Sequence, residues 1–379
     1  MKRIAIFCDG TWNEADAKYP TNVVKLAQAL SPTGADGGAQ QPVYIPGVGT
    51  GQGGGRFGKW IDKVGGGAFG WGLEDKIVEA YKALVLSHTP GDQIYIFGFS
   101  RGAYTARSLA ALLRSSAMPP RSRLEMVPEA VQHYRSHSKS RGPDGPEGLA
   151  FRHAMNPALV TSPAEAAWRA DNNLAPGVML NIAYLGIWDT VGALGVPKFW
   201  GGVAKYFNKQ YEFHNTDLSR SVGAARHAVA IDERRRAFPP TLWQNLEALN
   251  AASGGGGGAH YQQCWYPGVH GAVGGGGDIV ALSNDPLLWV AEGANRAGLD
   301  FDQVQLDAFA RARDYLGPLD NQSHTGGGIL KKLVALNTRD RDGPESASEL
   351  SLAARQRWLE ADPLYRPRTL RRVARDVGP

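Results

Sequence analysis

Short apolar runs alternate with amphipathic stretches along this chain. Helix-like stretches occupy about residues 21–30 and 73–87, and a third begins at Arg101. The apolar runs suit buried strands at residues 3–10, 41–49, 93–100, 180–190, 226–233 and 260–270. Continuous apolar strands separated by helices indicate a parallel sheet covered on both faces. The sequence therefore predicts an α/β fold with a mostly parallel central sheet of at least six strands, in a single domain over residues 1–379.

Two insertions interrupt this alternation. Residues 118–175 are mostly polar and basic with helical stretches, and residues 195–213 carry aromatic residues interleaved with lysines. One interpretation is ordinary packing of surface helices against the sheet. The other is a cap over a site that meets lipid, because Trp, Tyr, Phe and Lys together suit a membrane interface. Cap-like insertions at these two places are our expectation.

Composition excludes some classes of partner. The 379 residues are 43% hydrophobic, which is enough for a large core. Lys and Arg number 41 against 36 Asp and Glu, so the formal charge of +5 is small for this length. The one concentrated basic stretch, at residues 366–376, suits a solvent-exposed chain end. The alternative is a segment that contacts phosphate or lipid headgroups. We therefore expect no nucleic-acid partner.

The two cysteines and the N-terminal residues indicate the cellular compartment in which the protein folds. Cys8 and Cys264 lie in apolar strand-like runs, which is typical of small core residues and not of a disulfide framework. The first apolar run is short and is broken by Asp9, unlike a signal peptide. No apolar stretch approaches the roughly 20 residues that a membrane-spanning helix needs. We expect synthesis as a cytoplasmic protein, with any export by a route that ignores N-terminal signals.

A serine stands between two glycines where the third strand meets a helix. Gly98 to Gly102 read G-F-S-R-G, which fits G-x-S-x-G in a strand–turn–helix context. Such a turn holds the Ser100 hydroxyl on a strained backbone at the carboxyl edge of the sheet. Bulky side chains at Gly98 and Gly102 would collide with the neighbouring strand and helix. Ser100 is therefore a candidate nucleophile; the alternative is a serine that only caps the helix.

Backbone N–H groups beside Ser100 are candidates for an oxyanion hole. The Arg101 N–H is the first, because it stands at the N-terminus of the following helix. In α/β-hydrolase order the second comes from a loop after an earlier strand, where Gly10 or Thr11 could offer an N–H. Asp9, directly before that loop, is kept as a supporting residue.

A serine nucleophile needs a base and an orienting acid, which this fold supplies in the order Ser, Asp or Glu, His. Asp189 leaves a strand into a turn of small residues, whereas Asp232 precedes acidic and arginine residues that suit a structural salt-bridge network. We favour Asp189 and keep Asp232 as the alternative. For the base, His270 ends a strand and opens a glycine turn, while His227 lies mid-strand and is expected to be packed.

Glycine-rich loops suggest a competing function. Gly49, Gly51 and Gly54 satisfy G-x-G-x-x-G after a strand, but helical periodicity begins too late for a dinucleotide site. Neither H-E-x-x-H nor paired C-x-x-C occurs. We expect neither a metal nor an organic cofactor. The glycine run at 254–258 suits a flexible loop, and the run at 274–277 is expected to shape a pocket.

Eight segments, in order from residue 3 to about residue 370, resemble one known family. They are IAIFCDGTWN, TNVVKL, YIPGVGT, IYIFGFSRGAYTAR, LGIWDTVGALG, ARHAVAIDERRRAFPPTLW, YPGVHGAVGGG and YRPRTL. They are similar to the DUF2235-type α/β hydrolases, which include the catalytic domains of Tle1-class type VI secretion phospholipase effectors.

The resemblance implies an α/β-hydrolase fold, with Ser100, Asp189 and His270 at the positions of a Ser-Asp-His triad. It also implies lipid esters, especially phospholipids, as a substrate class, with peripheral membrane contact and a secretion-system or immunity partner. Where family members carry a polar pair after the histidine, this chain has Gly271 and Ala272.

The leading hypothesis is a serine ester hydrolase acting on carboxylic esters of lipid character. One alternative is a non-catalytic module that keeps the fold and binds a ligand or partner in the pocket. Nucleotide binding at the first glycine loop is a weaker third hypothesis.

Overall fold

The computed structural model describes residues 1–11, 13–49, 71–136, 140–192, 217–236, 238–253, 260–323 and 338–378. The predicted insertion at 195–213, the glycine run at 254–258 and most of the glycine loop at 49–54 lie outside these ranges.

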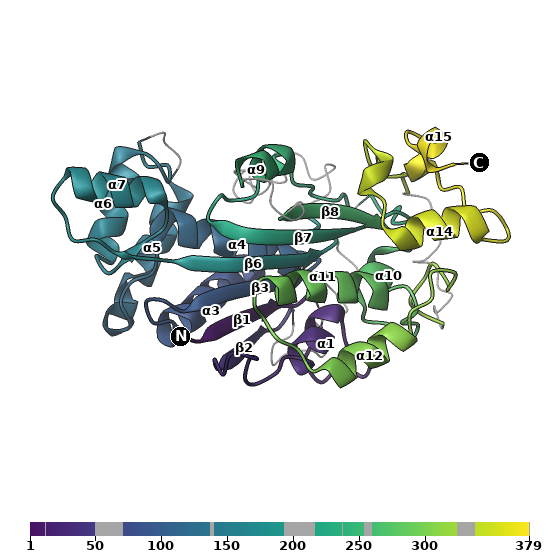
Figure 1. Cartoon of the computed structure of the whole chain (residues 1–379), viewed down its shortest axis with the longest axis horizontal. Helices are drawn as coiled ribbons and strands as arrows, with labels where there is room; N and C mark the ends of the chain where they lie inside the picture. The colour runs from purple at the N-terminus through teal and green to yellow at the C-terminus, as the bar shows by residue number, and fades with distance from the viewer. Residues whose placement is uncertain are drawn as a thin grey trace.

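One six-stranded sheet forms the centre of the molecule, in the order β2-β1-β3-β6-β7-β8 (Figure 1). Its strands are β1 (Arg3–Cys8), β2 (Gln40–Ile45), β3 (Gln93–Phe99), β6 (Asn181–Trp188), β7 (Val222–Ala230) and β8 (Tyr261–Tyr266). Every neighbouring pair in it is parallel, which confirms the predicted α/β class. A separate two-stranded sheet joins β4 (Leu159–Val160) to β5 (Val178–Met179).

Helices cover both faces of the sheet. Alternate residues of a strand face opposite sides, so Ile4 and Ile6 of β1 join one core while Ala5 and Phe7 join the other. Packed on the first face are α3 (Trp71–Ser87), α4 (Arg101–Ser116) and α9 (Leu246–Ala252). The second face carries α1 (Asn22–Gln28), α11 (Asn284–Arg296) and α12 (Gln303–Arg311) (Figure 1).

The insertion at 118–175 lies at the amino edge of the sheet, not over its carboxyl edge. It contains η1 (Arg121–Met126), α5 (Val127–Arg135), α6 (Pro146–Met155) and α7 (Pro163–Asp171). The Ser116 hydroxyl, in the last turn of α4, donates to the Ala130 carbonyl at 2.8 Å, and Asn156 donates to the Met118 carbonyl at 2.8 Å. Figure 1 shows these helices beside the start of β1, away from the G-x-S-x-G turn. The described helices of this insertion therefore lie away from the edge where we expected a cap.

The C-terminal segment, residues 338–378, packs against β7 and β8. Its elements are η3 (Ala347–Glu349), α14 (Leu352–Glu360), η4 (Arg368–Leu370) and α15 (Ala374–Val377). Trp265 of β8 is buried in a third core that includes Leu350, Trp358 and Leu370. Ser351 also donates its backbone N–H to the Trp265 carbonyl at 3.0 Å. Within the described ranges, every helix is too short or too polar to cross a bilayer.

Candidate active site

Ser100 occupies a tight turn between β3 and α4. Its φ of 58° and ψ of −122° put a non-glycine residue at positive φ, a sparsely populated conformation that stores backbone strain. The Ser100 N–H donates to the Trp188 carbonyl at 3.0 Å, which ties the turn to the end of β6. The Ser100 side chain makes no capping hydrogen bond to α4. The helix-cap interpretation therefore loses its support.

The two flanking glycines allow close backbone approach, as predicted. A Cβ at Gly98 would lie 2.4 Å from the Gly102 carbonyl oxygen, inside the first turn of α4. A Cβ at Gly102 would lie 2.1 Å from the Cys8 carbonyl oxygen and 2.5 Å from that of Asp9. Helix α4 can therefore start this close to the end of β1 only with glycine at these positions.

Asp189 and His270 meet at the same edge of the sheet. Asp189 follows β6 directly, has φ 37° and is fully buried. His270 opens the short helix α10 (His270–Gly274), and its Nδ1 lies 2.6 Å from Asp189 Oδ2. Asp189 Oδ1 also accepts the Ala230 N–H at 2.9 Å. An imidazole held in this way keeps its proton on Nδ1 and donates it as a hydrogen bond to the carboxylate, which leaves Nε2 as the basic nitrogen.

Ser100 lies next to this pair. The ring of Phe99, the preceding residue, lies 4.6 Å from the His270 ring centroid to centroid. Trp188, which accepts the Ser100 N–H, directly precedes Asp189. Among the described residues, hydrogen bonds join Asp189 to His270, but none joins the Ser100 hydroxyl to the imidazole.

Arg341 is a part of this site that the sequence analysis missed. Its Nη1 donates to Asp189 Oδ1 at 2.6 Å and its Nη2 to Asp189 Oδ2 at 2.9 Å. The same two nitrogens donate to the carbonyls of Ala230 and Phe238. Burial opposes the Asp189 charge, but Arg341 and the His270 hydrogen bond lower the pKa of this carboxyl well below its usual value. Arg341 lies 152 residues from Asp189, and no local motif marks it.

The loop after β1 borders Ser100. A Cβ at Gly10 would lie 3.3 Å from the Ser100 Cβ, so the loop backbone runs directly beside the serine. The Gly10 N–H donates to Asp9 Oδ1 at 2.7 Å. That N–H is occupied by the Asp9 carboxylate, which leaves Thr11 as the stronger of the two predicted donors. The Arg101 N–H stands at the N-terminus of α4, directly after Ser100.

Asp9 is a buried carboxyl at the base of this loop. The hydroxyls of Thr21 and Tyr44 both donate to it, each with a contact of 2.9 Å to Oδ2. Burial raises the pKa of Asp9 to about 6, although these hydrogen bonds favour the ionised form. Asp9 therefore holds the shape of the loop beside Ser100 and titrates closer to neutral pH than an ordinary aspartate.

The alternative acid, Asp232, and the mid-strand histidine, His227, have other partners. Asp232 Oδ2 accepts the Gly268 N–H and the Tyr365 hydroxyl, each at 2.7 Å, instead of forming the predicted arginine network. His227 is fully buried, and its Nε2 accepts the Thr190 N–H at 3.2 Å. Burial lowers the pKa of His227 to about 3, so it is a neutral packed histidine as predicted.

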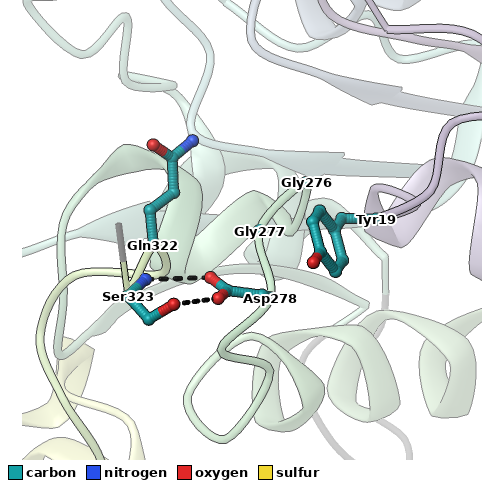
Figure 2. Close-up of a pocket in the computed structure, with 6 residues that line it drawn as sticks. All are labelled: Tyr19, Gly276, Gly277, Asp278, Gln322 and Ser323. Carbon is teal, nitrogen blue, oxygen red and sulfur yellow. Dashed lines mark hydrogen bonds between the residues drawn. The ribbon is translucent and has the colours of Figure 1, made fainter. Parts of the chain in front are cut away.

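The glycine run at 274–277 borders a pocket of about 460 Å³. Figure 2 shows its lining, which consists of Tyr19, Gly276, Gly277, Asp278, Gln322 and Ser323. The Asp278 carboxylate accepts both the backbone N–H and the hydroxyl of Ser323. A Cβ at Gly274 would lie 1.9 Å from the Phe99 ring, so this glycine lets Phe99 pack beside His270. Within the described part of the chain, no cluster of His, Cys, Asp or Glu could hold a metal ion.

A family model described as "T6SS, Phospholipase effector Tle1-like, catalytic domain" matches residues 2–293. The chain belongs to this family. The matched region contains Ser100, Asp189 and His270, whereas Arg341 lies beyond it.

Other proteins are similar over parts of their length. An uncharacterized protein of Saccharomyces cerevisiae, YEL023C, is 27% identical over 248 residues, which are 62% of this chain and 32% of that protein. Two solved structures are each 18% identical. An uncharacterized protein from Pseudomonas aeruginosa has a TM-score of 0.42 and covers 88% of this chain. The Tle1 effector bound to the VgrG spike of the type 6 secretion system has a TM-score of 0.38 and covers 74%. The chain spans about a third of the yeast protein and 52% of each solved chain.

Proposed function

We propose that this chain is a serine hydrolase that cleaves carboxylic esters of lipids, with Ser100, His270 and Asp189 as its triad. The observation that carries the proposal is the 2.6 Å contact between His270 Nδ1 and Asp189 Oδ2 beside the strained Ser100 turn. A histidine oriented by a buried carboxylate next to a serine is the arrangement that activates a hydroxyl nucleophile.

The proposed reaction proceeds through an acyl-enzyme. Ser100 Oγ attacks the acyl carbon while His270 Nε2 takes the hydroxyl proton, and the imidazolium then gives that proton to the leaving alcohol. Asp189 orients the imidazole and stabilises its charged form. The N–H groups of Arg101 and Thr11 receive the negative charge on the acyl oxygen. Water, activated by the same histidine, releases the acid.

The hydroxyl-to-imidazole hydrogen bond is the part of this reaction that must form with substrate. Catalytic hydrogen bonds are often long or poorly aligned in free enzymes and tighten only in the substrate complex. The proposal therefore requires the Ser100 hydroxyl to turn toward His270 when an ester occupies the site.

The family description supports a phospholipid as the substrate class and type VI secretion as the setting. We infer that the protein works at a lipid surface and that its partner is a component of the secretion system. Export by such a route needs no N-terminal signal.

Hydrolysis of phospholipid vesicles and of p-nitrophenyl butyrate by purified protein tests the proposal. We expect the wild type to release fatty acid from mixed phosphatidylglycerol and phosphatidylethanolamine vesicles, with a higher kcat/KM for them than for the soluble ester. Ser100→Ala and His270→Gln should each lower kcat by several orders of magnitude. Equal rates for the wild type and Ser100→Ala would instead support the non-catalytic binding module. A higher kcat/KM for the soluble ester than for the vesicles would contradict the lipid substrate class but not the serine hydrolase itself.

A further inference from the structure

The buried guanidinium of Arg341 is the strongest chemical feature of the site outside the Ser-His-Asp residues. Both of its terminal nitrogens donate to the Asp189 carboxylate, at 2.6 and 2.9 Å, in a bidentate ion pair. Such paired contacts between arginine and carboxylate fix orientation as well as charge. The side chain of Arg341 is only 4% exposed and that of Asp189 is fully buried, so water screens this pair very little.

Two backbone carbonyls anchor Arg341 from the other side. Its Nη1 donates to the Ala230 carbonyl at 2.7 Å, and its Nη2 donates to the Phe238 carbonyl at 2.9 Å. The Phe238 ring in turn packs edge-on against His270, with centroids 5.0 Å apart. The Arg341 guanidinium therefore contacts two groups that surround the His270 imidazole. One is the Asp189 carboxylate that orients the ring, and the other is the backbone of Phe238, whose side chain packs on the ring.

Other charged and titratable groups around the pair have different partners. Glu233 accepts the His270 backbone N–H at 3.3 Å, but its carboxylate is paired with Arg235 at 2.6 Å. His227 is neutral and buried behind the site. Within the described part of the chain, Arg341 is thus the cation that contacts Asp189 directly.

We propose that Arg341 is a positioning residue of the hydrolase, which holds the Asp189 carboxylate ionised and aimed at His270 Nδ1. This inference rests on the proposed function and deepens it. It makes the C-terminal segment, beyond the residues that the family model matches, a working part of the active site. Without Arg341 the carboxylate can turn away from the imidazole. The buried Asp189–His270 pair, no longer balanced by the guanidinium, would also bind a proton more readily, and the pair with that extra proton cannot act as a base.

The test is the pH dependence of kcat/KM for p-nitrophenyl butyrate in Arg341→Met, Arg341→Lys and a control, Arg339→Met. Arg339 is two residues away and pairs with Asp342 on the surface, where both side chains are more than 60% exposed. We expect Arg341→Met to lower kcat/KM about 100-fold, because small misplacements of catalytic groups have effects of this size. Its acid limb should move to higher pH by about one unit. The control should match the wild type.

Arg341→Lys separates charge from geometry. Lysine keeps the positive charge but offers no planar fork, so the acid limb should return toward the wild-type position while kcat stays lowered. A folded Arg341→Met with the wild-type rate and acid limb would overturn the inference. If that variant does not fold, a wild-type rate in Arg341→Lys would overturn it, and a lowered kcat at an unchanged melting temperature would support it. If the wild-type protein does not hydrolyse the ester, the proposed function is contradicted, and this inference with it.

Discussion

Two residues of the candidate triad have strained backbones. Ser100 and Asp189 have φ values of 58° and 37°, and each directly follows a strand of the central sheet. Non-glycine residues in this region cost about 1–3 kcal/mol each. Hydrogen bonds to the neighbouring strands, from the Ser100 N–H to Trp188 and from the Asp189 N–H to Ala228, hold both turns in place. Both turns lie at the carboxyl edge of the sheet, where β3 and β6 end.

Gly102→Ala should destabilise the protein although alanine favours helices. In an ordinary helix this change would stabilise by about 1 kcal/mol, but here the new methyl group would lie 2.1 Å from the Cys8 carbonyl. We expect a loss of more than about 2 kcal/mol in the free energy of unfolding, measured by urea denaturation. Ala111→Gly, in the same helix, is the control and should cost only about 1 kcal/mol. A stabilised Gly102→Ala would contradict the close approach of α4 to β1.

Asp9 should make stability fall between about pH 4 and pH 6. Its pKa of about 6 in the folded protein is above the ordinary value of 3.8, so the folded state binds the proton more tightly than the unfolded state. Stability from this group is then complete at low pH and is lost as pH rises through the folded-state pKa. Asp9→Asn does not titrate.

The unfolding free energy of the wild type relative to Asp9→Asn should therefore drop by about 3 kcal/mol from pH 4 to pH 7. Urea denaturation across this range measures the difference. Asp16→Asn, at an exposed position in the same loop, should run parallel to the wild type. A constant difference between the wild type and Asp9→Asn would contradict the burial of a charged Asp9.

Local sequence signals predicted most residues of the candidate site, whereas they do not reveal contacts between residues far apart in the chain. Ser100 was recognisable because Gly98 and Gly102 flank it at a strand–helix junction. Asp189 and His270 were found because each follows a strand, and ends of parallel strands meet at one edge. Arg341 has no such signal, since only tertiary packing of the C-terminal segment brings it to Asp189. The Gly10 N–H was predicted as a donor because the sequence does not reveal that Asp9 accepts it.

The parallel sheet also explains why the described helices of the insertion at 118–175 lie at the amino edge. Helix α4 starts at the carboxyl edge and runs back, so a chain that leaves its C-terminus emerges at the amino edge. The next sheet strand, β6, begins at that same edge, and the insertion joins the two ends there. Chain order alone therefore favours the amino edge for this segment, although its composition suggested a cap.

A buried charge cluster holds this insertion together. Glu165 of α7 contacts Arg152 of α6 and Arg169 of its own helix, each at 2.7 Å, and all three side chains are fully buried. Glu165→Ala would leave two buried arginines without their carboxylate, which typically costs about 3–5 kcal/mol. We expect a much lower melting temperature in calorimetry, with an unchanged kcat of the folded protein at 20 °C.

Glu147→Ala is the matched control in the same insertion. Glu147 pairs with Arg141 at 3.1 Å with both side chains more than half exposed, and such solvent-screened pairs contribute little to stability. A melting temperature of Glu165→Ala close to that of the control would contradict the buried cluster. A specific loss of kcat in folded Glu165→Ala would instead argue that this edge contributes to catalysis.

At the scale of the whole molecule, the C-terminal segment completes both the core and the site. Trp358 of α14 packs in the third core with Trp265 of β8, and the same segment carries Arg341. Trp358→Ala should lower the free energy of unfolding by about 3–5 kcal/mol. It should also reduce kcat, because it loosens the packing of the segment that positions the Arg341 guanidinium. Leu359→Ala, at an adjacent residue that is 55% exposed, should change neither. Urea denaturation and ester hydrolysis measure the two effects; an unfolding curve of Trp358→Ala equal to that of Leu359→Ala would contradict this packing.

Covalent labelling with a fluorophosphonate probe, followed by mass spectrometry of the labelled peptide, tests the triad most directly. The account predicts one label per molecule on the peptide that contains Ser100, none on that peptide in Ser100→Ala, and strongly slowed labelling in His270→Gln. Folded wild-type protein that takes up no label, or Ser100→Ala that is labelled as fast as the wild type, would contradict it.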